Sequence, residues 1–419
     1  MRFVSMFLLL VTALSAQQQT VTPAEREARW REDFHAMSAG LKARGIRIAG
    51  GIATRGQKDF AILYPKFDSE MEALHSEVAT LSDAEIVLRL MRLIASAGVA
   101  HNHVSMPLGM GFLYTLPFHV HWFADGLAVT SATPEYSEAL GARVVSIGGV
   151  KVEQFLADLA PYIPHENDTE LRNGAPSLMI SRGALDHFHM VGDDRRVTVQ
   201  LERPGGEALT LTVPLVIRNA EKIDVEKALQ IPAPLPRTHR EQRYYWHQYL
   251  PDSQTLYIQY NTCANDPKKH FGDFVNDVFA DADAHTVKRV VIDLRNNGGG
   301  NERVIGPLKS ALSERRSKVG PIYVLIGPAT FSSAVSNAEQ LHHSLGATLV
   351  GENSGGMPGG YGEVSTVTLP NSKLVVQFTT KRGDTAGPKT LTPEVLAPLR
   401  IRNFLDGRDP ALEAAIRGR

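Results

Sequence analysis

The chain has 419 residues, of which 43% are hydrophobic and 21% charged, and its 44 basic and 45 acidic side chains give a formal net charge of −1. This length is too great for one ordinary hydrophobic core, so we expect two or three folded domains. The composition excludes a disordered chain. The balanced charge gives no reason to expect nucleic acid or an anionic membrane as a partner.

The first 16 residues are typical of an export signal. Arg2 supplies a positive charge, Phe3 to Leu14 is a mostly apolar run, and small residues stand at positions 13, 15 and 16. The run is too short to span a bilayer. There is no cysteine near the expected cleavage point to which a lipid anchor could be attached. We therefore expect an exported protein, periplasmic or secreted, whose mature chain begins near Gln17 and has no membrane anchor. A buried N-terminal helix is the alternative.

Residues 22–111 are predicted to form an N-terminal helical region. Ser82 and Glu85 have the spacing of a capping box, in which each side chain bonds to the backbone of the other residue. Apolar residues then recur on one helical face until a glycine ends the helix. A loop with two histidines, His101 and His103, follows it.

Residues 112–225 carry the signals of short strands. The runs 126–130 and 142–147 are apolar and bounded by glycine. The alternating runs 197–201 and 208–213 are joined through a Pro-Gly-Gly turn, which is typical of a hairpin. We therefore expect a β-rich module here.

A proline-rich stretch at 232–236 predicts a linker, after which strands and helices alternate. Apolar strands are predicted at 256–260, 290–294, 322–326 and 348–350, with helices between them. This alternation implies right-handed βαβ units and a parallel sheet within residues 226–419, so the predicted fold class is α/β. Functional loops are expected at the carboxyl ends of these strands.

Two loops after predicted strands contain residues suited to hydrolysis. The segment 293–301 has three consecutive glycines, whose backbone N–H groups suit an anion or an oxyanion, and it lacks the lysine of a phosphate loop. The segment 327–334 leads from a strand into a helix, which would expose a serine hydroxyl. Taken singly, the first loop could be a bare tight turn and the second an ordinary helix cap.

Together, these loops resemble the tail-specific (C-terminal processing) serine peptidase family. The family's Asp-Leu-Arg-Asn-Gly-Gly turn, serine turn and Gly-Glu loop have counterparts, in this order, at Asp293–Gly300, Thr330–Ala334 and Gly351–Gly356. The similarity covers roughly residues 256–412. It implies a crotonase-like core, and the strands of 112–225 loosely resemble the family's PDZ-like module.

The resemblance implies Ser332 as the nucleophile, with Ser333 as the neighbouring alternative. It implies an oxyanion hole formed by the N–H of Gly298 or Gly299 together with that of Ser333. Bacterial processing proteases of the family have a lysine base in the loop after the Gly-Glu pair, where this chain has Met357.

The tricorn-like branch of the family instead takes a histidine from an N-terminal loop, which implies His101 as the base and His103 as its alternative. Imidazole titrates near neutral pH, which suits a general base. A carboxylate should orient this histidine. Glu363, Asp384 and Glu352 are the candidates, and the sequence does not choose among them.

The sequence therefore predicts a serine endopeptidase that hydrolyses a peptide or protein substrate through an acyl-enzyme. No cofactor is implied, and no histidine or cysteine spacing indicates a metal site. We interpret the single cysteine, Cys263, as a buried apolar residue and His119 and His121 as structural. A ligand-binding protein without catalysis on the same fold and an esterase-like hydrolase are the alternative functions, and the oligomeric state is left open.

Overall fold

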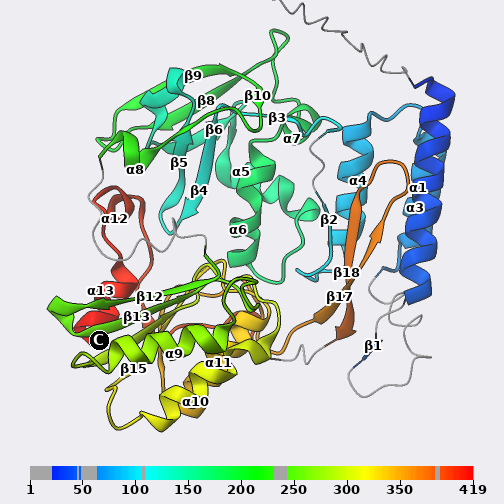
Figure 1. The fold of residues 1–419 in the computed structure, drawn as a ribbon. Helices are drawn as coiled ribbons and strands as arrows, with labels where there is room; N and C mark the ends of the chain where they lie inside the picture. Colours follow the sequence, from blue (N-terminus) through cyan, green and yellow to red (C-terminus); the bar gives the residue numbers. More distant parts are fainter. Residues whose placement is uncertain are drawn as a thin grey trace, which may run out of the picture.

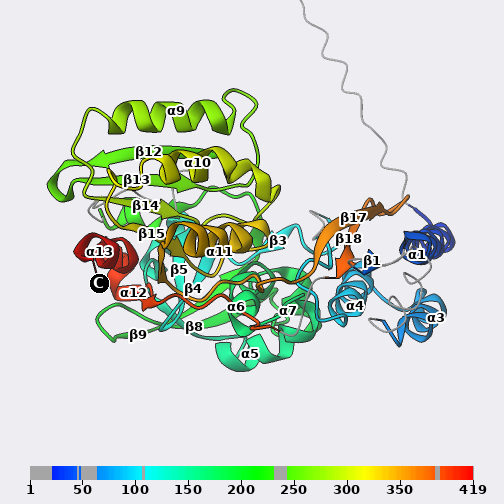
Figure 2. The same ribbon diagram turned by 90° about the horizontal axis from the view of Figure 1, so that it is seen from below.

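The structure is a computed structural model that describes residues 21–44, 47–48, 64–105, 109–230, 243–382 and 387–418. The predicted export signal, the predicted linker and the candidate Asp384 lie outside these residues. Figures 1 and 2 both place the N-terminal helices at the opposite end of the molecule from the C-terminal helix, with a β-rich region and an α/β region between them. Within the described ranges, no helix combines the length and the apolar character that a bilayer crossing requires.

The C-terminal region is built on a six-stranded sheet in the order β12-β13-β14-β15-β16-β19. Its strands are β12 (Tyr245–Leu250), β13 (Thr255–Tyr260), β14 (Arg289–Asp293), β15 (Ile322–Ile326), β16 (Thr348–Gly351) and β19 (Val395–Leu396). The neighbours from β13 to β19 pair in parallel, and β12 pairs antiparallel with β13 at the edge. The predicted α/β alternation is confirmed, because strands buried on both faces need a helical layer on each side.

Helices cover both faces of this sheet. They are α9 (Phe271–Ala282), α10 (Gly306–Glu314), α11 (Ser333–Leu345) and α13 (Pro410–Arg417). The 3₁₀ turns η4 (Pro251–Ser253) and η5 (Glu302–Ile305) lie in the connecting segments, and α12 (Ile401–Leu405) packs against the β-rich region. One apolar cluster joins the strands to α9, α10 and α11, and a second joins them to α13. The carboxyl ends of β14 and β15 therefore open at one edge of a sheet whose faces are closed.

The β-rich region contains a seven-stranded sheet in the order β11-β5-β6-β8-β9, with β4 paired to β5 and β7 to β6. The strands are β4 (Phe118–Phe123), β5 (Gly126–Ala132), β6 (Arg143–Ile147), β7 (Val150–Lys151), β8 (Arg196–Glu202), β9 (Ala208–Pro214) and β11 (Ile223–Asp224). A two-stranded sheet joins β3 (Tyr114–Thr115) to β10 (Val216–Ile217), and η2 (Pro134–Ala139), η3 (Ala160–Tyr162) and α8 (Val225–Ala228) are short. The predicted hairpin is confirmed as β8 and β9, paired antiparallel.

This region also contains three helices that the strand signals did not indicate, namely α5 (Val152–Leu159), α6 (Asp168–Met179) and α7 (Arg182–His187). In α6 the buried residues Leu171, Ala175 and Leu178 have helical spacing, and the side chain of Asn167 caps its N-terminus. Pro176 lies inside the same helix. Because proline normally marks the end of a helix, the pattern around it did not predict one.

The N-terminal region consists of α1 (Pro23–Arg44), α3 (Phe67–Glu77) and α4 (Asp83–Ala95), and the predicted capping box of Ser82 and Glu85 is present. A hairpin of β17 (Gly362–Thr368) and β18 (Val375–Arg382) packs on these helices, and β18 pairs with both β1 (Arg47–Ile48) and β2 (His103–Val104). Figure 1 shows this hairpin beside the N-terminal helices.

The hairpin comes from the predicted 226–419 core but lies with the predicted 22–111 region. Asp33 of α1, whose side chain is buried, accepts hydrogen bonds from the backbone N–H groups of Asn371 and Ser372 in the hairpin turn, at 2.7 and 2.8 Å. The packing therefore does not follow contiguous sequence boundaries, and the hairpin carries C-terminal residues to the loop of His101.

Candidate active site

Ser332 stands at a sharp turn between β15 and α11. Its backbone angles are φ 52° and ψ −127°, in a region that residues other than glycine rarely adopt. Its side chain makes no capping hydrogen bond to α11, although it occupies the N-cap position. Its Oγ instead lies 3.0 Å from Nε2 of His101. The helix-cap alternative therefore does not describe Ser332.

The neighbouring hydroxyls have internal roles. Thr330 is buried, and its Oγ1 accepts the N–H of Gly327 at 3.0 Å and donates to the carbonyl of Leu294 at 2.9 Å. Ser333 Oγ donates to the carbonyl of Gly300 at 2.6 Å. These bonds tie the serine turn to the glycine turn after β14, so both loops keep one relative position.

His101 reaches Ser332 from the loop that follows α4. Its ring is half-buried and lies 4.6 Å from the ring of Phe331, centroid to centroid. Burial, with a smaller contribution from the nearby charge of His103, lowers the pKa of His101 to about 4. The imidazole is therefore neutral near pH 7, and when its Nδ1 carries the proton its Nε2 can accept the hydrogen of the Ser332 hydroxyl.

His103 does not share this position. It begins β2, and its Nδ1 lies 3.5 Å from Nε2 of Gln377 on the paired strand β18. Burial lowers its pKa as well. Of the two candidate bases, the structure brings His101 to the serine.

The described residues provide no carboxylate partner for the His101 ring, because its Nδ1 is buried without a hydrogen bond. Neither Glu363 nor Glu352 therefore orients this ring. Glu363 lies on β17, where its backbone carbonyl accepts the hydroxyl of Thr380. Glu352 faces a separate cavity, where burial raises its pKa.

The loop of His101 is instead held through its backbone and through Asn102. The carbonyl of His101 accepts Nε2–H of Gln377 at 3.0 Å. The buried Asn102 accepts the N–H of Thr379 at 2.6 Å and donates to the hydroxyl of Tyr64 at 2.8 Å. Because Gln377 and Thr379 belong to β18, the C-terminal hairpin fixes the N-terminal histidine loop.

The glycine turn lies directly against the serine. Gly299 has φ +102°, and a Cβ on it would stand 2.7 Å from Cβ of Ser332, so a larger residue does not fit. The N–H of Gly299 donates to Oδ1 of Asn297 at 2.9 Å, whereas Gly298 is exposed at the turn. Of the two glycines predicted for the oxyanion hole, Gly298 is therefore the better placed to join Ser333, the first residue of α11.

A buried polar network supports this turn from below. Asn297 donates to the carbonyl of Tyr260 at 2.8 Å, and Cys263 donates through Sγ to Oδ1 of Asn297 and of Asn337, at 3.5 and 3.4 Å. Burial raises the pKa of the Cys263 thiol to about 11. Cys263 is thus a buried structural thiol, as interpreted from the sequence. Asn337 was not singled out in the sequence, although a polar residue on the buried face of α11 is the signal that marks it.

An ion-pair network closes the far side of the turn. Arg295 is bonded to Asp293 at 2.6 Å and to Asp409 at 2.8 Å, and these two carboxylates hold its pKa well above its usual range. Asp409 also caps α13 by accepting the N–H of Leu412. The charged residues of the Asp-Leu-Arg motif therefore attach the C-terminal helix to the turn.

The loop after β16 packs on the serine turn from the opposite side. The N–H of Gly356 donates to the carbonyl of Thr330 at 3.0 Å, and Met357 is buried in the same loop. The residues before α6 rest on this loop, because Nδ2 of Asn167 donates to the carbonyls of Gly355 and Lys389, at 2.9 and 2.7 Å. The β-rich region thus contacts the serine loops directly.

Two carboxylates at the start of α6 accompany this contact, and the sequence analysis did not single out either of them. Burial raises the pKa of Glu166. Burial and the neighbouring Glu166 raise the pKa of Glu170 to about 7. A Cβ on Gly355 would stand 2.2 Å from Oε2 of Glu170, so this carboxyl lies against the loop. The only sequence signal for them is two acids four positions apart around Asn167, the cap of α6.

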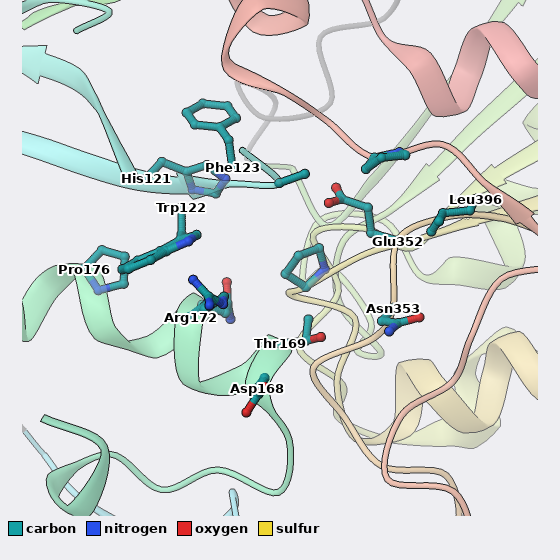
Figure 3. Close-up of a pocket in the computed structure, with 14 residues that line it drawn as sticks. His121, Trp122, Phe123, Asp168, Thr169, Arg172, Pro176, Glu352, Asn353 and Leu396 are labelled. Atoms are coloured by element: carbon teal, nitrogen blue, oxygen red, sulfur yellow. The ribbon is translucent and has the colours of Figure 1, made fainter. Parts of the chain in front are cut away.

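Two cavities separate the β-rich region from the α/β region, and neither is lined by Ser332 or His101. The smaller, of about 240 Å³, lies between β4, α6 and the loop of Glu352 (Figure 3). Inside it the guanidinium of Arg172 stacks over the ring of Trp122 at 4.7 Å. The larger, of about 650 Å³, is lined by both His119 and His121 among others. No group of three histidine, cysteine, aspartate or glutamate residues in the described part of the chain could hold a metal ion.

No protein-family model and no curated protein matches this sequence. Among solved structures, mature CPAF complexed with lactacystin is 16% identical, with a TM-score of 0.60 over 94% of this chain and 99% of that one. A crystal structure of mature CPAF gives 15% identity, a TM-score of 0.61, and coverage of 94% and 97%. The photosystem II D1 C-terminal processing protease is 15% identical over 92% and 96%, with a TM-score of 0.42. The chain therefore shares its fold with mature CPAF over nearly its whole length.

Proposed function

We propose that this chain is a serine peptidase of the tail-specific kind, which cleaves peptide bonds through an acyl-enzyme on Ser332. The observation that carries the proposal is the 3.0 Å contact between Ser332 Oγ and His101 Nε2 at a strained strand-to-helix turn. The fold shared with mature CPAF supports it. So do the three sequence motifs, whose loops meet around Ser332.

In the proposed reaction, Ser332 Oγ attacks the carbonyl carbon of the scissile peptide bond while His101 Nε2 takes the hydroxyl proton. The N–H groups of Gly298 and Ser333 face the negative oxygen that forms on this carbon. His101 then gives the proton to the leaving amine, and the acyl group remains on Oγ. A water molecule, deprotonated by His101, releases the acyl group and restores the serine.

We further propose that the chain is exported and that its first 16 residues are removed. Its short apolar run and small residues before Gln17 support this proposal. N-terminal sequencing of protein recovered from outside the cytoplasm should give a mature chain that starts near Gln17. Recovery of that protein with Met1 in place would contradict the proposal.

The test of the function is labelling of the folded protein with a fluorophosphonate, followed by mapping of the modified residue and turnover of paired peptide and ester substrates. We expect the label on Ser332 and hydrolysis of the peptide. Because lactacystin is bound in one mature CPAF structure, it is a second probe for the same serine. Absence of labelling and of turnover would favour a ligand-binding protein, and turnover of esters alone would favour an esterase-like hydrolase.

A further inference from the structure

The orientation of His101 requires an explanation, because its Nδ1 is buried and has no hydrogen-bond partner among the described residues. In a serine-histidine pair, a misplacement of about 1 Å costs on the order of 10²-fold in rate. Among the described residues the ring meets Ser332 and Phe331, and further contacts hold the backbone that carries it. On the C-terminal side of the loop, Gln377 and Thr379 of β18 provide these contacts.

On the N-terminal side, the contact comes from a different region of the molecule. The N–H of Ala100, the residue directly before His101, donates to Oε1 of Glu166 at 3.4 Å. This bond joins positions 66 residues apart in the sequence. Ala100 directly precedes His101, so a bond to its N–H acts on the backbone that carries the imidazole.

Glu166 is itself fixed to the serine side of the site. The next residue, Asn167, bonds to the carbonyls of Gly355 and Lys389. Gly356 in turn bonds to the carbonyl of Thr330 in the serine turn. The chain of contacts therefore runs from the serine turn through the loop after β16 to Glu166, and from there to the histidine loop.

The surroundings of Glu166 match a carboxylate that bonds to backbone. Burial raises the pKa of Glu166, while the backbone N–H of Ala100, the charge of Lys389 and the backbone of Met357 lower it, in that order. Glu170, in the first turn of α6, lies against the loop of Gly355, and its Oε2 is buried without a hydrogen bond. Of these two acids, the structure places Glu166 on the histidine loop.

We propose that Glu166 is a positioning residue, whose carboxylate holds Ala100 and thereby keeps His101 in line with Ser332. This inference rests on the proposed function. It assigns to the β-rich region a direct part in the alignment of the site, through a carboxylate that bonds to the backbone before the histidine and not to its ring.

The first experiment compares Glu166→Ala with Glu166→Gln on one peptide substrate. We expect Glu166→Ala to lower kcat by about 10²-fold with KM changed by less than about twofold, because the loss is in alignment and not in substrate binding. Glu166→Gln keeps an oxygen that can accept the Ala100 N–H, so its kcat should stay within about tenfold of the wild type. A kcat of Glu166→Ala within about twofold of the wild type would overturn the proposal, as would a glutamine variant as slow as the alanine one.

Glu170→Gln is the matched control, because it removes a neighbouring carboxylate in the first turn of α6 that does not bond to Ala100, and its kcat should equal that of the wild type. If Glu166→Ala does not fold, Glu166→Leu removes the acceptor while filling the same volume, and the same loss is expected. A wild-type kcat in a folded Glu166→Leu would contradict the role of the carboxylate.

The second experiment places Glu166→Ala in a His101→Ala background. A residue that acts by aligning His101 has nothing to align there, so the double variant should be no slower than His101→Ala alone. A further loss of about 10²-fold in the double variant would show a role that does not pass through His101 and would overturn the inference. If the wild type neither hydrolyses peptides nor labels at Ser332, the proposed function fails and this inference fails with it. If the wild type is active and Glu166→Ala is equally active, the inference alone fails.

Discussion

The two halves of the site are supported in different ways. On the serine side, the glycine turn is held from below by Tyr260, Cys263 and Asn337, which all belong to the α/β part of the chain. The β-rich region meets this side at the loop after β16, through Asn167. The histidine side is held by contacts from three regions. Tyr64 and Thr379 bond to Asn102, the latter across 277 positions, and Glu166 bonds to Ala100.

The parallel sheet therefore positions the serine turn, whereas contacts between distant regions of the chain position His101. Strand ends in a parallel sheet bring their loops together by topology alone. The loop of His101 belongs to no such arrangement and depends on a hairpin and on the start of α6. Removing the serine hydroxyl should therefore abolish peptide turnover. Removing a residue that supports the His101 loop should lower kcat only in part.

The largest effect is expected on the serine side. Ser332→Ala should abolish peptide turnover and leave the melting temperature within a few degrees of the wild type, because the hydroxyl is half-exposed and bonds to His101 rather than to the core. Steady-state kinetics and thermal unfolding of the purified variant give both values. Ser333→Ala is the control, since its hydroxyl bonds to a carbonyl and its N–H is retained. An active Ser332→Ala beside an inactive Ser333→Ala would move the nucleophile by one residue.

The next effect is on the base. His101→Ala should lower kcat by about 10²- to 10⁴-fold, the usual scale for losing a proton-transfer group. His103→Ala should cost far less, because its ring faces Gln377. Lys373→Ala should change nothing measurable, since its amine is exposed and bonds to the carbonyl of Pro370. Turnover of the three variants on one substrate identifies the general base. An inactive lysine variant beside an active His101→Ala would indicate a serine-lysine mechanism instead.

The pH dependence of activity tests the pKa of His101. An unperturbed imidazole would give an acidic limb near pH 6 to 7, roughly. Burial lowers the pKa of His101 to about 4, and the base works when it is deprotonated, so activity should be retained down to about pH 5 and then fall about tenfold per pH unit below pH 4. The pH profile of kcat/KM, which reports the free enzyme, measures this limb. A limb at pH 6.5 would show that the His101 ring is exposed in solution.

A smaller effect is expected from the support of the histidine loop. Asn102→Ala removes the acceptor of the Thr379 N–H and the donor to the Tyr64 hydroxyl, both in buried surroundings. The loss of these two buried hydrogen bonds should lower the free energy of unfolding by roughly 0.5–1.5 kcal/mol each and reduce kcat through misalignment of His101. Urea unfolding and kcat measure the two effects, and Asn297→Ala is the counterpart on the serine side. An Asn102→Ala variant with unchanged kcat would show that the hairpin does not position the histidine.

The smallest effect concerns stability at the contact of α6 with the serine loops. The pKa of Glu170 is raised to about 7 in the folded state, so the charged form is disfavoured there and the wild type loses stability as pH rises from about 4.5 through 7. Glu170→Gln cannot ionise and should be more stable than the wild type at pH 8, by on the order of 1–3 kcal/mol, and equal to it near pH 4. Chemical unfolding at both pH values tests this expectation. An advantage that appears at pH 4 and disappears at pH 8 would contradict the raised pKa.

Much of the serine side could be predicted from the sequence because its signals are local. The apolar runs that become β14 and β15, the glycines that allow the approach of Gly299 to Ser332, and the capping box at Ser82 each lie within a few residues of what they determine. The β-rich region was predicted less completely. Its hairpin was found from its turn, but α6 was missed because Pro176 interrupts the helical pattern.

Local sequence patterns predicted the alternation of strands and helices and the serine and glycine turns at adjacent strand ends. They also placed His101 and His103 in one loop after the N-terminal helices. Packing brought His101, the base that the resemblance implied, to within 3.0 Å of Ser332, left its ring without a bond to Glu363 or Glu352, and placed Glu166 beside Ala100. The reason is physical. Backbone periodicity and turn geometry act over a few residues and are written in the local pattern, whereas hydrogen bonds between Asn102 and Thr379, or Ala100 and Glu166, exist only after distant segments have packed together.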